Sequence, residues 1–131
     1  MTSMVIIGAG PGGYEAASVA AAGGVDVTVV EETGIGGAAV LTDCVPSKTL
    51  IATAEVTSTL RRAAELGLRH TETFEVDLDA VNSRVRQLAQ AQSDDISRGL
   101  ERKGVRLISG RARLATGAPG HLHRVVINDD E

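Results

Sequence analysis

Four short segments rich in apolar residues punctuate the chain, and their lengths are typical of β-strands. Residues 4–7 (MVII) form a continuous apolar run that stops at Gly8, which predicts a buried strand. Residues 25–31 (VDVTVVE) alternate before becoming fully apolar, as expected of a second, parallel strand. Two further strands are predicted at residues 105–109 (VRLIS) and 122–127 (LHRVVI), separated by the turn-rich sequence ATGAPG.

The segment between the first two strands has the pattern of a helix. It reads PGGYEAASVAAAGG, is rich in alanine, and has Pro11 near its first turn, where a missing N–H breaks no helical hydrogen bond. Gly23 and Gly24 end it, because glycine readily adopts the left-handed conformation that closes a helix. Strand, helix and strand together form a βαβ unit, which predicts two neighbouring parallel strands.

Two longer helices are predicted in the middle of the chain. The first begins at Pro46 and runs through PSKTLIATAEVTSTLRRAAEL to Gly67. The second begins after Asp77, whose side chain suits an N-cap, and ends at Gly104. Its apolar residues recur mostly at steps of three or four residues or at sums of those steps, and are Leu78, Val81, Val85, Leu88, Ile96 and Leu100.

The order of these elements is typical of an α/β protein with a parallel sheet. The 131 residues suit one domain, and 43% of them are apolar, with one Phe, one Tyr and no Trp, so Val, Ile, Leu and Ala must fill the core. The three central strands leave nothing to cover the outer edge of the first strand, and an open edge is a liability. We therefore expect the sheet to continue, and residues 1–131 to be the front part of a longer protein.

Charge and composition exclude several classes of function. Thirteen Lys and Arg against seventeen Asp and Glu give a formal net charge of −4 without a long basic cluster, which argues against a nucleic-acid surface. Charge or glycine breaks every longer apolar stretch, and no basic leader is visible, so neither a membrane span nor a signal peptide is expected. One cysteine forms no intrachain disulfide, which favours the cytoplasm. His70, His121 and His123 lack the paired spacing of metal ligands, so no metal site is predicted.

A glycine-rich stretch, GAGPGG, lies between the first predicted strand and the first predicted helix and fits G-x-G-x-x-G. In such a loop Gly8 allows the tight turn, Gly10 lets a pyrophosphate approach the backbone, and Gly13 lets the helix pack closely on the strand. Pro11 and Gly12 complete the loop, and the free N–H groups of the helix N-terminus favour an anion. The motif predicts a phosphate-binding site.

An acidic residue at the end of the second predicted strand makes this interpretation more specific. Glu31 lies eighteen residues past Gly13, where a carboxylate accepts hydrogen bonds from the hydroxyls of a ribose. Its charge also repels a 2′-phosphate. The two features together predict an adenine dinucleotide other than NADP in this loop, with Glu32 as an exposed neighbour.

A second glycine-rich segment, GGAAVLTDCVPSK, contains the only cysteine of the chain. Together with the first motif it resembles the pyridine nucleotide-disulfide oxidoreductases, the flavoprotein family of dihydrolipoyl dehydrogenase and glutathione reductase. In that family the segment commonly reads Gly-Gly-Thr-Cys-Leu-Asn-Val-Gly-Cys-Ile-Pro-Ser-Lys and carries a redox-active cysteine pair. The positions that match without a gap are Gly36, Gly37, Cys44, Pro46, Ser47 and Lys48, with Val45 in place of Ile.

The resemblance spans essentially the whole chain and implies a Rossmann-like fold whose first dinucleotide loop holds FAD. In relatives the backbone of the turn at residues 110–112 meets the FAD adenine, which adds Ala112 to the expected cofactor site. The matching lysine, Lys48, stands near the flavin N5. The resemblance further implies that residues 1–131 are the N-terminal part of the FAD-binding domain of a homodimer, whose NAD(P) domain and C-terminal dimerisation domain lie outside this chain.

The chain departs from the family pattern at the first cysteine, whose position is occupied by Ala39. Cys44 matches only the second cysteine, which in relatives lies against the flavin. We expect Cys44 just ahead of the helix that contains Pro46 in its first turn, where the helix dipole favours a thiolate and a nearby Asp43 carboxylate disfavours one. Two interpretations stay open, a flavin contact and a small buried apolar residue without chemistry.

One thiol cannot store two electrons as a disulfide, so electrons from NAD(P)H have one economical route, through FAD directly to an acceptor. Family members that lack the first cysteine include NAD(P)H:quinone reductases, and GIGGAAV followed by DCVPSKT resembles their sequence. We expect an NAD(P)H:quinone oxidoreductase as the full-length protein and no activity from residues 1–131 alone. Two alternatives stay open: a dihydrolipoyl dehydrogenase or transhydrogenase-like enzyme whose second thiol lies beyond residue 131, and a nucleotide-binding module without turnover.

Overall fold

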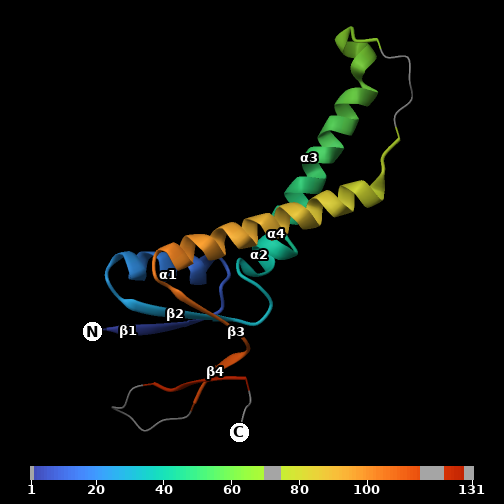
Figure 1. Cartoon of the computed structure of the whole chain (residues 1–131). Coiled ribbons are helices and arrows are strands. Elements are labelled where there is room, and N and C mark those ends of the chain that lie inside the picture. Colours follow the sequence, from blue (N-terminus) through green and yellow to red (C-terminus); the bar gives the residue numbers. More distant parts are fainter. Residues whose placement is uncertain (1, 70–74, 116–122, 129–131) are drawn as a thin grey trace.

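The computed structural model describes residues 2–69, 75–115 and 123–128. Figure 1 shows a small sheet with helices on one side, from which two long helices project as an arm. The elements in chain order are β1 (Ser3–Ile7), α1 (Pro11–Ala22), β2 (Asp26–Glu31), α2 (Gly37–Leu41), α3 (Cys44–Arg61), the 3-10 helix η1 (Ala63–Leu66), α4 (Leu78–Arg102), β3 (Arg106–Ser109), β4 (Ala112–Leu114) and β5 (Val125–Ile127).

The sheet is parallel and has the order β1-β2-β3. In its register Ile6 lies opposite Val29, and Val29 lies opposite Leu107. β2 is the middle strand, which explains why Val29 and Val30 are completely buried. The predicted α/β class, the parallel sheet and its three central strands are confirmed.

β1 is a strand, as predicted, but the prediction that it is buried is wrong. Met4, Val5 and Ile7 are 40%, 46% and 46% exposed. β1 lies at the edge of the sheet, and within the described residues it pairs only with β2. A short apolar run does not by itself distinguish a central strand from an uncovered one.

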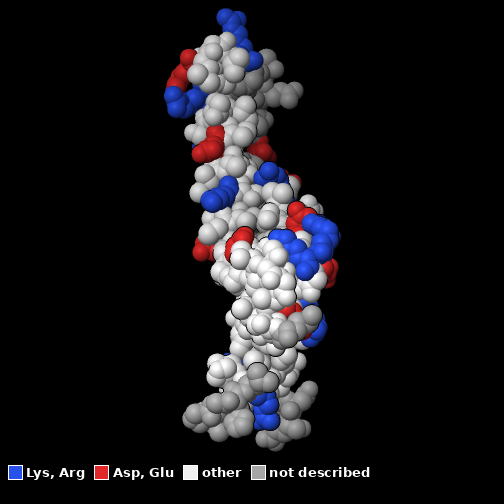
Figure 2. Space-filling view, turned by 90° about the vertical axis from the view of Figure 1, so that its left-hand side faces the viewer, with Lys and Arg blue, Asp and Glu red and all other residues white. Residues whose placement is uncertain are grey.

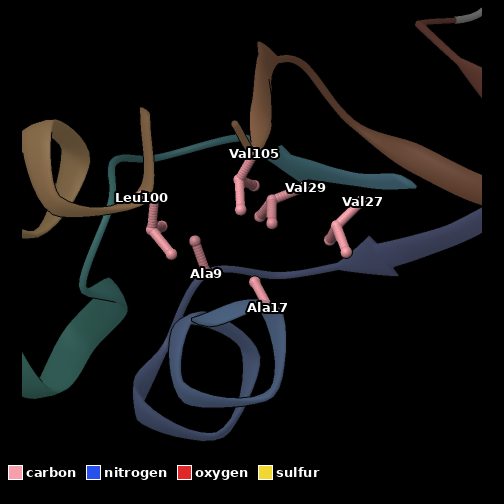
Figure 3. Close-up of a cluster of buried hydrophobic side chains, with 6 residues drawn as sticks. All are labelled: Ala9, Ala17, Val27, Val29, Leu100 and Val105. Atoms are coloured by element: carbon pink, nitrogen blue, oxygen red, sulfur yellow. The ribbon is translucent and has the colours of Figure 1, made fainter. Parts of the chain in front are cut away.

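The main core lies between the sheet and the helices α1 and α4. Figure 3 shows its side chains pointing toward one another from α1, β2 and the C-terminal end of α4. Its members are small or branched, as the composition predicted, and are Ala9, Ala17, Val27, Val29, Leu100 and Val105. This packing holds the β1–α1 connection firmly against the sheet.

α1 and α4 agree with their predicted ends. Asp77 caps α4 as expected, because its Oδ1 accepts a hydrogen bond of 2.9 Å from the amide of Ala80. Gly104 follows the helix with a φ of 79°, the left-handed conformation that its position required.

α3 and α2 differ from the prediction. α3 begins at Cys44 rather than at Pro46, because a proline in the first turn lacks only an N–H that has no acceptor within the helix. It ends at Arg61, and the chain continues as η1 up to Gly67. The helix α2 was not predicted: it begins at Gly37, in the glycine-rich segment, and its five residues are too short to show a periodic pattern.

The remaining elements extend the molecule in two directions. α3 and α4 contact each other, and in Figure 1 they lie close together near the start of α3, from which α3 runs away from α4 toward the top of the picture. β4 and β5 form a separate antiparallel ribbon in which Ala112 lies opposite Ile127. The strand predicted at residues 122–127 is observed at Val125–Ile127, and its first residue lies outside the described part of the chain.

The surface carries both signs of charge. On the face shown in Figure 2, basic and acidic side chains are interspersed along the length of the molecule. None of the helices in the described ranges combines the length and the apolar character that crossing a bilayer requires.

Candidate functional site

The carboxyl ends of the three parallel strands meet at one edge of the sheet, the usual place for a ligand in such folds. Gly8 follows β1, Glu31 ends β2, and Gly110 follows β3. The amide of Gly8 donates to the carbonyl of Val30 at 2.8 Å, and the amide of Gly110 donates to the carbonyl of Glu31 at 2.9 Å. These bonds extend the sheet pairing into the loops that form the candidate site.

The glycine loop has the geometry that its motif predicts. Gly8 has a φ of 97°, which favours glycine. A Cβ added to Gly13 would lie 1.9 Å from the carbonyl oxygen of Gly8, so only glycine permits this approach of α1 to the end of β1. A Cβ on Gly10 or Gly12 would meet no atom within 4 Å, so the space beside these residues is open. Gly10 is the N-cap of α1, and no side chain caps the helix there.

The Glu31 carboxylate joins the loop after β1 to the loop after β2 through hydrogen bonds. Its Oε2 accepts the amide of Ala9 at 2.7 Å, and its Oε1 accepts the amide and the hydroxyl of Thr33, each at 2.8 Å. The amide of Gly34 contributes a longer bond of 3.4 Å. Partial burial by itself raises the pKa of the Glu31 carboxyl, but these hydrogen bonds outweigh it and hold the pKa below the ordinary value of 4.5.

The second glycine-rich segment packs on the first. The amide of Gly36 donates to the carbonyl of Ala9 at 2.8 Å. Gly36 and Gly37 have φ values of 100° and 59°, and a Cβ on Gly37 would lie 3.0 Å from the Cα of Gly10. The two glycine-rich segments, separate in the sequence, therefore contact each other directly in the structure.

Two hollows flank Glu31. One, of about 270 Å³, lies between the loop of Thr33 and Gly34 and the end of β3. The other, of about 230 Å³, is lined by residues that include Gly8, Glu31 and Ala112. The structure therefore brings together the residues predicted for phosphate, ribose and adenine, although they come from three separate parts of the sequence.

Cys44 and Lys48 lie on a different element, the first turns of α3. Both side chains are exposed, and neither lines the two hollows beside Glu31. Cys44 is the first residue of the helix, whereas the sequence placed it just ahead of the helix. Its exposure contradicts the interpretation as a small buried residue. The side chain of the N-cap, Asp43, makes no capping hydrogen bond.

Two residues of the site were not found from the sequence. The hydroxyl of Thr33 donates to the Glu31 carboxylate two residues earlier, and a hydroxyl residue so close in the chain to the predicted ribose-binding carboxylate is a signal that could have identified it. Ser93 donates from α4 to the carbonyl of Ile35 at 2.6 Å across 58 residues, and no local pattern predicts such a contact.

The predicted absence of a metal site concerns residues that the structure covers only in part. His70 and His121 lie outside the described residues. Within residues 2–69, 75–115 and 123–128, no group of three or more His, Cys, Asp and Glu side chains could hold a metal ion.

Comparisons with known proteins relate the whole chain to one family. Residues 2–126 match the family model described as pyridine nucleotide-disulphide oxidoreductase. The chain is 48% identical over 124 residues to an NAD(P)H dehydrogenase (quinone) of Mycobacterium tuberculosis, a match that covers 92% of this chain and 25% of the relative. It is 36% identical over 110 residues to a dihydrolipoyl dehydrogenase of Chlamydia muridarum, covering 84% of this chain and 23% of the relative.

Solved structures show the same relationship. LpdA from Mycobacterium tuberculosis matches with a TM-score of 0.87 and 47% identity over 95% of this chain and 27% of that chain. The flavoprotein disulfide reductase RclA from Escherichia coli, at 22% identity and a TM-score of 0.68, shares the fold. The chain spans about a quarter of the length of these relatives. From its first strand to its last, the chain belongs to the pyridine nucleotide-disulphide oxidoreductase family, as its glycine loop, Glu31 and cysteine segment together indicated.

Proposed function

We propose that the intact protein carrying this chain is an FAD-dependent oxidoreductase that passes electrons from NAD(P)H through the flavin directly to a quinone-type acceptor. The observation that carries this proposal is the single thiol. Ala39 occupies the position of the first redox cysteine, and Cys44 is the only cysteine of the chain. A disulfide relay needs two thiols, whereas direct transfer from a flavin needs none. The name of the 48% identical relative, NAD(P)H dehydrogenase (quinone), supports the same acceptor class.

The site suits the adenosine and pyrophosphate of FAD. The open space beside Gly10 and Gly12 at the N-terminus of a twelve-residue helix suits a pyrophosphate. Glu31 Oε2 accepts one amide and has a lone pair left for a ribose hydroxyl. The cofactor-binding residues that we propose are Gly8, Gly10, Pro11, Gly12, Gly13, Glu31, Gly36, Gly37 and Ala112. When bound, FAD supplies an isoalloxazine ring that takes up two electrons and releases them to an acceptor.

Cys44 and Lys48 are proposed to serve the flavin end of the cofactor. They lie four residues apart on α3, so they are about one turn apart on the same face of the helix. The positive charge of Lys48 favours a reduced, anionic flavin. Cys44, at the first position of the helix, is suited to contact the flavin without relaying electrons through a bridge.

The proposed domain organisation rests on length and on the open edge. We propose that residues 1–131 are the N-terminal part of the FAD-binding domain, and that other parts of a cytoplasmic homodimer supply the NAD(P) and dimerisation domains. The chain spans about a quarter of the curated relatives, and β1 presents an unpaired edge within the described residues.

Two other functions are testable beside this one. Several relatives at 34–38% identity are named dihydrolipoyl dehydrogenase, an activity that would require a second thiol beyond residue 131. A binding module without turnover is the remaining alternative.

The deciding measurement is NADH and NADPH oxidation by the intact, FAD-loaded gene product, with a soluble quinone and with lipoamide as acceptors under one set of conditions. We expect turnover with the quinone and none with lipoamide. The variant Cys44→Ser should keep most of the quinone turnover and change the flavin absorbance, since the thiol only contacts the flavin. Turnover with lipoamide alone would refute direct transfer, and a purified protein with neither flavin nor NAD(P)H oxidation would support the binding module.

A further inference from the structure

A side-chain hydrogen bond that spans 58 residues joins Ser93 to the glycine-rich loops. Ser93 lies on α4, is 5% exposed, and donates its hydroxyl to the carbonyl of Ile35 at 2.6 Å. Ile35 itself packs against the main core. The contact therefore joins the core helix to the loop between Gly34 and Gly37.

This contact completes the anchoring of a single peptide group. The carbonyl of Ile35 and the amide of Gly36 belong to the same planar unit. The carbonyl accepts from Ser93, and the amide donates to Ala9 on the phosphate loop at 2.8 Å. Because Gly36 has no side chain and has a φ of 100°, its own sterics restrict the orientation of this plane little. The two hydrogen bonds therefore help to fix that orientation.

The orientation of this peptide extends to the phosphate loop. The carbonyl of Ala9 receives the Gly36 amide, while the amide of Ala9 donates to Glu31 Oε2 at 2.7 Å. One residue further on, Gly37 approaches Gly10 so closely that a Cβ would lie 3.0 Å from its Cα. A rotation of the Ile35–Gly36 peptide would break the hydrogen bond from the Gly36 amide to the Ala9 carbonyl.

We propose that Ser93 is a positioning residue of the dinucleotide site: it orients the Ile35–Gly36 peptide so that Gly36 holds Ala9, and with it the phosphate loop, in the form that binds FAD. The inference rests on the proposed FAD site. It assigns to α4, which lines neither hollow beside Glu31, a role in cofactor affinity.

The neighbouring Ser97 provides a matched control. Its hydroxyl donates to the carbonyl of Ser93, four residues back in the same helix, at 2.9 Å. This is the ordinary behaviour of serine within a helix. Ser93→Ala and Ser97→Ala remove the same group from the same helix, but only the first removes a bond to the loop.

The first experiment measures the FAD dissociation constant of the intact gene product after removal of its cofactor. Ser93→Ala is expected to raise the constant about tenfold, because the partly buried carbonyl of Ile35 loses its donor. Ser97→Ala is expected to stay within about twofold of the unsubstituted protein. Equal constants for the two variants would overturn the inference. If Ser93→Ala does not fold, Ser93→Cys, with nearly the same volume and a weaker donor, should raise the constant in the same direction.

The second experiment measures hydrogen exchange of the Gly36 amide without FAD. We expect exchange at least about tenfold faster in Ser93→Ala than in Ser97→Ala, with no such difference at the Val105 amide, which donates to Leu100. A general loss of stability would accelerate both amides and would overturn the positioning role. If the unsubstituted protein fails to bind FAD, the proposed function is wrong, while this exchange measurement still tests the anchoring of the peptide.

Discussion

The Glu31 carboxylate shows how one side chain serves both the fold and a ligand site. Oε1 accepts hydrogen bonds from the amide and the hydroxyl of Thr33 and a longer one from the amide of Gly34. Oε2 accepts the amide of Ala9. A carboxylate has about four lone-pair sites, so Oε2 keeps capacity for one ribose hydroxyl. The sequence predicted the ribose contact alone, whereas the structure shows that Glu31 also organises the loops around it.

We predict that Glu31 makes the stability of the site depend on pH. The pKa of Glu31 is lower in the folded protein than in an unfolded chain, so the folded state binds fewer protons in that range. The stabilisation is therefore fully present above the ordinary value of 4.5 and is lost as the pH falls through the folded pKa. Glu31→Gln removes this titration. At pH 7 it should lower the stability by about 1–3 kcal/mol, since an amide replaces a charged acceptor.

Thermal unfolding of the cofactor-free gene product between about pH 7 and pH 3.5 measures this effect, a range that spans the ordinary glutamate pKa. The midpoint difference between the unsubstituted protein and Glu31→Gln should shrink as the pH falls. Glu32→Gln is the control, because Glu32 is exposed and its contact with Arg111 is 4.0 Å long. A difference that stays constant over the whole range would show that ionisation of Glu31 does not contribute.

The close approach of α1 to β1 depends on one glycine. Gly13 leaves no room for a Cβ beside the carbonyl of Gly8, whereas Gly10, with a φ of −66°, leaves room beside it. The two glycines belong to one motif but serve different purposes. Gly13 serves the packing of a helix on a strand, and Gly10 serves the ligand.

Alanine substitutions should separate these purposes. Gly13→Ala should destabilise the cofactor-free protein by about 1–3 kcal/mol or more, because the methyl group forces α1 away from β1. Gly10→Ala should leave that stability nearly unchanged and weaken FAD binding, because its methyl group occupies the space left for the pyrophosphate. Circular dichroism on heating and FAD titration measure the two effects. A stable Gly13→Ala protein would contradict the packing role, and normal FAD binding by Gly10→Ala would contradict the ligand role.

At the scale of the whole molecule, β1 has one edge paired with β2 and one edge without a partner among the described residues. The amide of Asp26 donates to the carbonyl of Thr2, and the amide of Gly8 donates to the carbonyl of Val30, so the backbone N–H and C=O groups of even-numbered residues in this stretch point toward β2. Because these groups alternate in direction along a strand, the N–H and C=O groups of Val5 and Ile7 point toward the outer edge. Both residues are exposed, although a single apolar run contains them.

If residues 1–131 are part of a larger FAD-binding domain, a further strand should pair with this edge. The Val5 and Ile7 amides should then exchange in the intact gene product at least about a hundredfold more slowly than unpaired amides, as paired strand amides do. Gly8, whose amide is bonded to Val30 at 2.8 Å, is the protected reference. Rapid exchange at Val5 and Ile7 beside a protected Gly8 would mean that the edge stays open.

The sequence by itself determined the features that depend on neighbours along the chain. The βαβ unit, the Asp77 cap, the glycine loop and the place of Glu31 at a strand end are all determined by residue type and spacing. Even the family was recognisable, because its two motifs are short and contiguous. Steric and hydrogen-bonding rules that act within a few residues are sufficient for each of these.

Tertiary structure alone decided which segments meet. The contact of Ser93 with Ile35, the approach of Gly37 to Gly10, the exposure of Cys44 and the open edge of β1 join or separate residues that have no local pattern in common. A contact such as that of Ser93 with Ile35 arises when helices pack on a sheet and bring distant polar groups together away from water, where each must find a hydrogen-bond partner.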